Sequence, residues 1–148
     1  MQIYAYTLAA VVVGAVITAQ PPMNAVLARA VGNAYGATAV SIGVAFISIL
    51  AVTLFFGRGD LSIKTLASVP WWVYLAGLGG TIFVGAGVVI APVTGALLFF
   101  VCIVAGQLIG STLFDHLGAF QLETRPVTGT RIAGIALALI GAVMVSRG

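Results

Sequence analysis

Two amide side chains lie four residues apart inside an apolar stretch near the start of the chain. Gln20 and Asn24 share one face if this stretch is helical, and the tandem prolines Pro21 and Pro22 lie between them. Proline has no backbone N–H, so it leaves carbonyl groups without their helical donors. We expect amide donors, amide acceptors and free carbonyls to face a polar ligand here. The alternative is that the two amides only satisfy the bent backbone or bridge two helices.

A second polar stripe lies late in the chain. Gln107, Ser111 and Asp115 follow one another at steps of four, so they also share one helical face. They could line a cavity, or they could provide an interhelical hydrogen bond and a solvated helix end. A parallel stripe of small residues at the same spacing is most simply a helix-packing face: Cys102, Gly106 and Gly110.

Asp115, at the end of the polar stripe, and its neighbour His116 are the residues that could carry a proton or couple an ion. Adjacent positions on a helix point about 100° apart, so the two side chains cannot easily act as one unit. The simpler interpretation is that they mark where the helix meets water. Trp71 and Trp72 suit the headgroup belt of a membrane and are candidates for the rim of a binding site.

Enzyme signatures are missing from the sequence. One His, three acidic residues and one Cys give no plausible metal cluster, and no glycine run ends in the Lys-Ser/Thr pair of a nucleotide loop. No serine is placed to act with His116 as a nucleophile and base. We therefore predict that the chain is not an enzyme and binds no metal or cofactor.

The composition places the chain in a membrane. Apolar residues make up 61% of the sequence and charged ones 6%, against roughly a quarter charged in a soluble domain. Such a chain lacks the polar residues to cover a soluble core, so its surface must face lipid. The 19 glycines suit close packing of transmembrane helices. Six Lys and Arg residues are spread along the chain instead of forming one basic face, which argues against nucleic-acid binding.

The chain divides into stretches long enough to cross about 30 Å of hydrocarbon. The run from Trp71 to Phe114 carries no charge, and as one helix it would span about twice the thickness of the bilayer. It must therefore turn back, and Pro92 is the strong helix breaker near its middle. We therefore predict a single all-α transmembrane domain over residues 1–148, with a first helix kinked at Pro21-Pro22 and a tight hairpin at Pro92. Its five helices are expected at about 3–30, 35–56, 71–90, 93–114 and 130–145.

The first apolar stretch lacks the basic start of a signal peptide, so we expect it to be retained as a helix. In a five-helix arrangement four Lys and Arg residues fall on one side and two on the other, a weak orientation signal. Insertion in both orientations is then credible, and two oppositely inserted chains would recreate the inverted repeat of many transporters. A small-residue face on the last helix is the candidate dimer contact: Gly134, Ala138 and Gly141.

The order of these motifs resembles the YdcZ-like family of half-sized bacterial transporters, within the drug/metabolite transporter superfamily. The match covers nearly the whole chain, and its features follow in order: Gln20 with Asn24, Arg29 with Gly32, Ser41, Pro70-Trp71-Trp72, Ala91-Pro92 with Gly95, Gly106-Gln107, Ser111, Asp115-His116, Gly118, Pro126 and Gly134. The resemblance implies a five-helix protein of the bacterial inner membrane that works as an inverted dimer on small metabolites. Related small multidrug transporters carry a membrane-embedded glutamate in the first helix. Here the comparable position is Gln20, which cannot titrate.

Together these features predict a secondary transporter that moves a small neutral, zwitterionic or cationic metabolite or drug by alternating access, as an antiparallel homodimer in contact with membrane lipid. Its substrate site is expected to use Gln20, Asn24, Gln107, Ser111, Trp71 and Trp72, with Asp115 or His116 for ion coupling. The rival prediction is a small structural or regulatory subunit that packs against a larger membrane complex. In that case the polar residues serve only to hold helices together.

Overall fold

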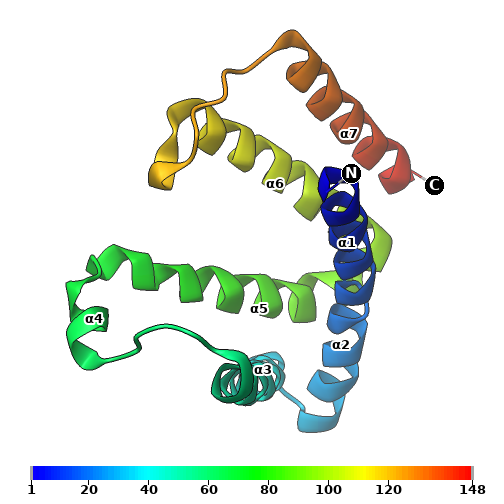
Figure 1. Cartoon of the computed structure of the whole chain (residues 1–148). Coiled ribbons are helices and arrows are strands. Elements are labelled where there is room, and N and C mark those ends of the chain that lie inside the picture. The colour runs from blue at the N-terminus through cyan, green and yellow to red at the C-terminus, as the bar shows by residue number, and fades with distance from the viewer. Residues whose placement is uncertain (1, 148) are drawn as a thin grey trace. The chain divides into compact units, whose positions relative to one another are not determined.

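The computed structural model describes residues 2–147 and contains helices and loops but no strand within that range. Figure 1 shows the helices in chain order. The α-helices are α1 (Gln2–Ile17), α2 (Gln20–Val31), α3 (Ala34–Phe56), α4 (Ile63–Ser68), α5 (Ala76–Thr94), α6 (Ala96–Leu117) and α7 (Gly129–Arg147), and the short 3-10 helices are η1 (Trp71–Leu75) and η2 (Ala119–Gln121). The predicted all-α class is confirmed.

Five segments of the described chain are long and apolar enough to cross a membrane: Ile3–Val31, Ala34–Phe56, Trp71–Thr94, Ala96–Leu117 and Gly129–Arg147. The predicted number of membrane helices is therefore confirmed. Their bounds are shifted by a few residues from the predicted ones, mostly because α5 and α6 both extend farther toward the C-terminus than the sequence pattern suggested.

The chain separates into two compact units, Met1–Pro92 and Val93–Gly148, which are described separately below. The boundary falls within the run for which the sequence demanded a turn. Whether the two units form the single domain expected from the sequence stays a prediction.

In the first unit, α2 and α3 pack together across a two-residue turn. Gly32 ends α2 with a φ of 74°, a left-handed conformation that glycine adopts without steric cost. Asn33 then begins α3, because its side chain accepts a hydrogen bond from the Tyr35 N–H at 2.9 Å. The predicted stop and turn at Gly32-Asn33 is confirmed. Small residues such as Ala25 and Ala37 are buried in this unit, which lets the helices approach closely.

The break between the third and fourth membrane helices lies at Gly95, three residues after the predicted position. Pro92 is inside α5, where it removes the donor that the Val88 carbonyl would otherwise receive, but the helix continues to Thr94. Gly95 has a φ of 81°, which other residues rarely adopt, and it directly precedes α6. Pro92 therefore removes one hydrogen bond from α5 without ending the helix, and Gly95 adopts the left-handed φ at which the helix ends. The tight hairpin itself stays a prediction.

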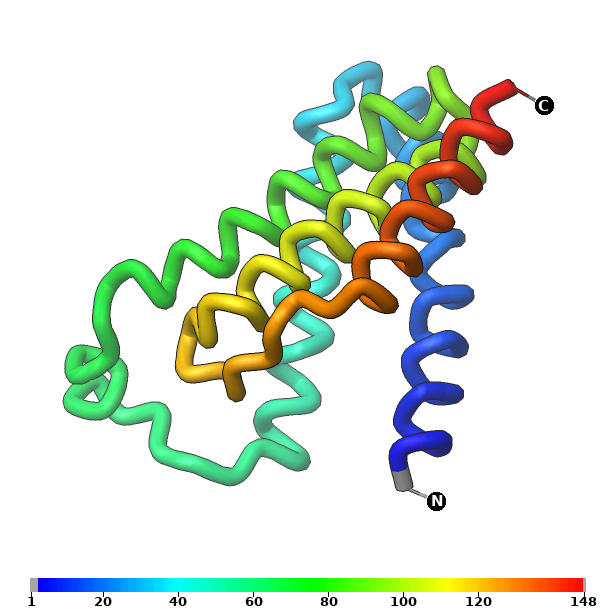
Figure 2. The backbone as a smooth tube through the Cα atoms, turned by 90° about the horizontal axis from the view of Figure 1, so that it is seen from above, coloured from blue at the N-terminus to red at the C-terminus, as the bar shows by residue number. Residues whose placement is uncertain are grey.

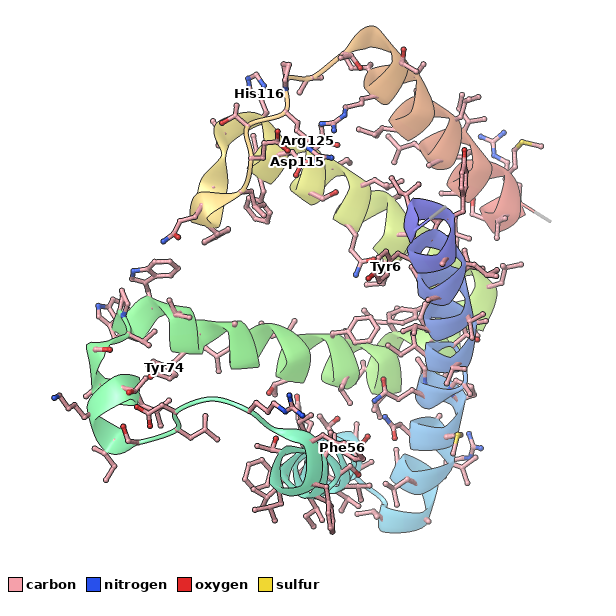
Figure 3. All side chains as sticks on the ribbon, viewed as in Figure 1. Tyr6, Phe56, Tyr74, Asp115, His116 and Arg125 are labelled. Atoms are coloured by element: carbon pink, nitrogen blue, oxygen red, sulfur yellow. The ribbon has the colours of Figure 1, made fainter. Side chains whose placement is uncertain are left out.

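The polar segment after α3 contains the short helix α4, where the sequence suggested only a loop. Ser62 starts α4 as its N-cap, and Asp60 accepts hydrogen bonds from the Ser62 N–H at 2.8 Å and from the hydroxyls of Ser62 and Thr65. The Tyr74 hydroxyl donates to the Leu66 carbonyl at 2.6 Å, which ties η1 to α4 (Figure 3).

In the second unit, α6 and α7 lie side by side, as the yellow and the orange-to-red tube in Figure 2 show. Buried alanines, Ala105 and Ala142, allow the two helices to approach. Gly118 ends α6 with a φ of 60°, and the following segment folds back so that the Arg125 N–H donates to the Asp115 carbonyl at 2.8 Å. This contact fixes the C-terminal end of α6, where the predicted ion-coupling residues lie.

Candidate functional site

The first predicted polar pair lies at an interruption in the first membrane span. Helix α1 ends at Ile17, the chain turns through Thr18 and Ala19, and α2 restarts at Gln20 with both prolines in its first turn. Prolines are tolerated there because first-turn N–H groups need no helical acceptor. Because neither proline has an N–H, the Ile17 and Thr18 carbonyls receive no donor from the usual position four residues later. A bend of the span at the prolines stays a prediction.

Asn24 is buried, with 7% of its surface exposed, on the α2 face that also buries Pro21 and Ala25. Its amide nitrogen Nδ2 has no hydrogen-bond partner within the described chain. A buried donor without an acceptor costs about 1–3 kcal/mol, so native structures rarely keep one without a reason. Gln20, one turn earlier, is half-buried. The first span therefore holds an unsatisfied buried amide on α2, a second amide one turn earlier, and two carbonyls without helical donors at the break before α2.

The residues of the second predicted stripe, on α6, differ in whether their side chains have hydrogen-bond partners. Gln107 is exposed near the middle of α6, and its side-chain amide makes no hydrogen bond to any residue within 2–147. Ser111 is also exposed, but its hydroxyl donates to the Leu108 carbonyl at 3.2 Å and needs no other partner. Since an amide in hydrocarbon is costly, Gln107 requires cover from another surface, a water-filled cavity or a ligand.

Asp115 forms an ion pair that the sequence did not indicate. Its Oδ2 lies 3.4 Å from Arg131 Nη1, at the start of α7, and about a third of each side chain is exposed. The same Arg131 nitrogen donates to the Arg125 carbonyl at 3.3 Å. Half-exposed pairs of this kind contribute up to about 1 kcal/mol. The contacts join the two helices of the second unit, so Asp115 has a structural role besides any role in coupling.

His116 is separated from Asp115, as the adjacent helical positions predicted. Figure 3 shows Asp115 beside Arg125, with His116 projecting away from them. His116 lines an apolar hollow of about 390 Å³ between α6 and α7, together with residues that include Thr112, Val127 and Ile132. This hollow could not be predicted from the sequence, because the hollow forms only where α6 packs against α7.

The tryptophans are at the start of the third span. Trp71 and Trp72 lie in η1, with 73% and 46% of their surfaces exposed. This exposure at a span end suits a headgroup position. Their expected role at the rim of a substrate site stays a prediction.

The candidate dimer face on α7 is partly open. Gly134 is exposed, and a Cβ added to it or to Gly141 would meet nothing within 4 Å. Ala138 is half-buried and lies closer to the side of α7 that contacts α6. The face therefore has room for another backbone, although the contact itself stays a prediction.

The Asp60 carboxyl lies outside the membrane spans, in the polar segment between α3 and α4. The Thr65 hydroxyl, the Ser62 N–H and the Ser62 hydroxyl all donate to its carboxylate and hold its pKa below the ordinary value of 3.8. Residues 2–147 contain no group of three or more His, Cys, Asp or Glu side chains that could hold a metal ion.

Comparison with known proteins gives two matches to one family. The family model described as "Putative inner membrane exporter, YdcZ" matches residues 5–144. The inner membrane protein YdcZ of Escherichia coli (strain K12) is 34% identical over 105 residues, which cover 70% of this chain and 67% of that protein. No solved structure matches the chain. With its five apolar spans, the chain thus belongs to the YdcZ family, and it is a multi-pass membrane transporter of the inner membrane.

Proposed function

We propose that this chain is a secondary transporter that recognises its substrate through the Gln20 and Asn24 amides and works by alternating access. The observation that carries the proposal is the buried Asn24 Nδ2, which has no hydrogen-bond partner in the described chain. A substrate that accepts a hydrogen bond from Nδ2 would remove the cost of burying this donor. The broken span supports the same role, because interrupted helices are common at transporter binding sites.

The chemistry of this side of α2 favours uncharged, zwitterionic or cationic substrates. Amide and carbonyl groups can pair with hydroxyl, amide or ammonium groups, whereas a strongly anionic substrate would call for a cation beside it. Gln107 and Ser111 are the candidates from the second unit, and Trp71 and Trp72 are the candidates at the rim. Asp115 and His116 remain the proposed coupling residues, because they are the titratable groups at the end of α6.

The proposed functional unit is an antiparallel homodimer in the bilayer. If each of the five apolar segments crosses the bilayer once, residues 2 and 147 lie on opposite sides of the membrane. Two oppositely inserted copies would then form an inverted pair, an arrangement in which rocking alternates access to a shared site. The open space at Gly134 and Gly141 supports close helix contact between copies along the face that these glycines share with Ala138.

Ligand binding by the purified protein tests the substrate site. A panel of neutral, zwitterionic and cationic compounds is screened for an increase in melting temperature, and each stabilising compound is then followed into proteoliposomes. We expect Gln20→Ala with Asn24→Ala to abolish both the stabilisation and the uptake. The matched control is Thr7→Val on α1, whose exposed hydroxyl is already bonded to the Ile3 carbonyl at 2.8 Å. If the double variant binds and transports like the unmodified protein, the site is wrong.

Labelling of a single cysteine tests the dimer. In a Cys102→Ser background, Leu61→Cys places one exposed thiol in the loop before α4. We expect a membrane-impermeant maleimide to label about half of the chains from each side of the membrane. Labelling from one side alone would contradict the antiparallel pair. Copurification of a second, larger membrane protein in fixed ratio would favour the subunit role instead.

A further inference from the structure

An apolar groove runs between α3 and α5 of the first unit. Its volume is about 940 Å³, and its lining residues recur on one face of each helix, including Tyr35, Ala39 and Phe46 from α3 and Ala86 and Ile90 from α5. The helices approach each other within it, because a Cβ added to Gly85 would come into van der Waals contact with the Thr38 methyl carbon, at 3.7 Å. All the lining residues belong to membrane spans, so the material that fills the groove is hydrocarbon.

The length of the groove matches one leaflet of the bilayer. From Ala34 to Phe46, α3 rises about 18 Å, and from Thr81 to Ile90, α5 rises about 14 Å, at about 1.5 Å per residue. Half of a hydrocarbon core about 30 Å thick is about 15 Å. A membrane-spanning helix of a second copy would need a surface about twice as long. An acyl chain that enters from one side fits the observed length.

A second hollow, of about 420 Å³, adjoins the groove at the membrane edge. It shares Ala34 with the groove and is lined by residues of α2, the α2–α3 turn and the end of α5, including Arg29, Asn33 and Pro92 (helices labelled in Figure 1). The groove therefore adjoins, at Ala34, a space that is lined by a guanidinium group and by the polar turn of the helix pair.

Arg29 is a cation without a counterion among the described residues of this unit. The described ion pairs are those of Arg125 with Glu123 and of Arg131 with Asp115, and none involves Arg29. The acidic residue of the first unit is Asp60, which follows the opposite end of α3. A guanidinium at the membrane edge binds phosphate oxygens well, often through two parallel N–H donors.

We propose that the α3–α5 groove and the Arg29 hollow together bind one anionic phospholipid, with its phosphate at Arg29 and one acyl chain along the groove. An anionic lipid is favoured over a zwitterionic one because the hollow offers a positive charge and no acidic side chain. The lipid would complete the surface of the first unit on the side where α3 and α5 leave space.

Native mass spectrometry of the purified full chain, titrated with phosphatidylglycerol or phosphatidylcholine of identical acyl chains, tests this site. We expect one phosphatidylglycerol to bind in preference to phosphatidylcholine. Arg29→Gln should lower the affinity for phosphatidylglycerol about fivefold, the effect of one basic side chain near an anionic lipid, and Arg29→Lys should retain most of it. Equal affinities for the two lipids, or no change in Arg29→Gln, would overturn the proposal.

A second pair of variants tests the groove separately from the charge. Ala39→Trp fills the groove and should weaken binding of both lipids, whereas Ala51→Trp, exposed on α3 outside the groove, should not. If Ala39→Trp leaves lipid binding intact but disrupts the dimer, the groove holds a second copy and the lipid proposal is wrong. Displacement of phosphatidylglycerol by millimolar inorganic phosphate would show that the site reads phosphate alone, which would also overturn it.

Discussion

Replacing Asn24 with leucine separates a binding role from a structural role for this buried amide. Leucine has the same branched arrangement of four heavy side-chain atoms but carries no polar atom, so Asn24→Leu removes the unpartnered Nδ2 and, being somewhat larger, leaves no cavity. A buried, unsatisfied donor costs about 1–3 kcal/mol. We therefore expect the substitution to raise the free energy of unfolding of the ligand-free protein by about that amount, while binding is lost.

The assay is reversible unfolding in mixed detergent micelles, followed by the helical circular dichroism signal, with and without a stabilising compound from the screen. Asn24→Ala is the matched comparison, because it also removes the amide but leaves a void. The void should offset much of the gain. If Asn24→Leu instead destabilises the ligand-free protein by 1 kcal/mol or more, the amide is satisfied in the folded protein and serves helix packing, and the reasoning for a substrate role fails.

Two further predictions concern the ends of helices. Gly118→Ala should destabilise the protein by more than about 1 kcal/mol, because the φ of Gly118 is 60° and the new Cβ would lie 2.6 Å from Thr124 Oγ1. The control is Gly110→Ala, whose new Cβ would meet no atom within 4 Å. Equal melting temperatures of the two variants would contradict the argument. The Asp60 carboxyl should titrate below 3.8 in an NMR pH series, since the folded form favours the carboxylate. Its contribution to the order of the α4 segment is therefore present above pH 3.8 and lost as the pH falls through the lowered pKa. Thr65→Val should move that midpoint upward, because the Thr65 hydroxyl is the largest cause of the shift; an unchanged midpoint would mean that the hydroxyl does not bond the carboxylate in solution.

The sequence by itself determined the membrane class, the number of spans and most of their ends. Those properties depend on composition and on local stereochemistry: 6% charged residues cannot cover a soluble core, and Gly32-Asn33 can be recognised as a stop and turn from residue type alone. The sequence predicts the break between the third and fourth spans at Pro92, because a proline inside a helix costs stability. In α5 the helix continues past that proline, and the left-handed φ of glycine marks its end.

Only the tertiary structure decided which polar groups are buried, paired or left without partners. Gln20 and Asn24 look alike in the sequence, yet Asn24 is buried with a free donor and Gln20 is half-buried. Asp115 gained Arg131 as a partner because α7 folds back along α6, and the Arg29 hollow exists because α2, α3 and α5 converge there. Periodicity places residues on a helical face, but burial and pairing depend on the neighbouring helix, and that information is not local in the chain.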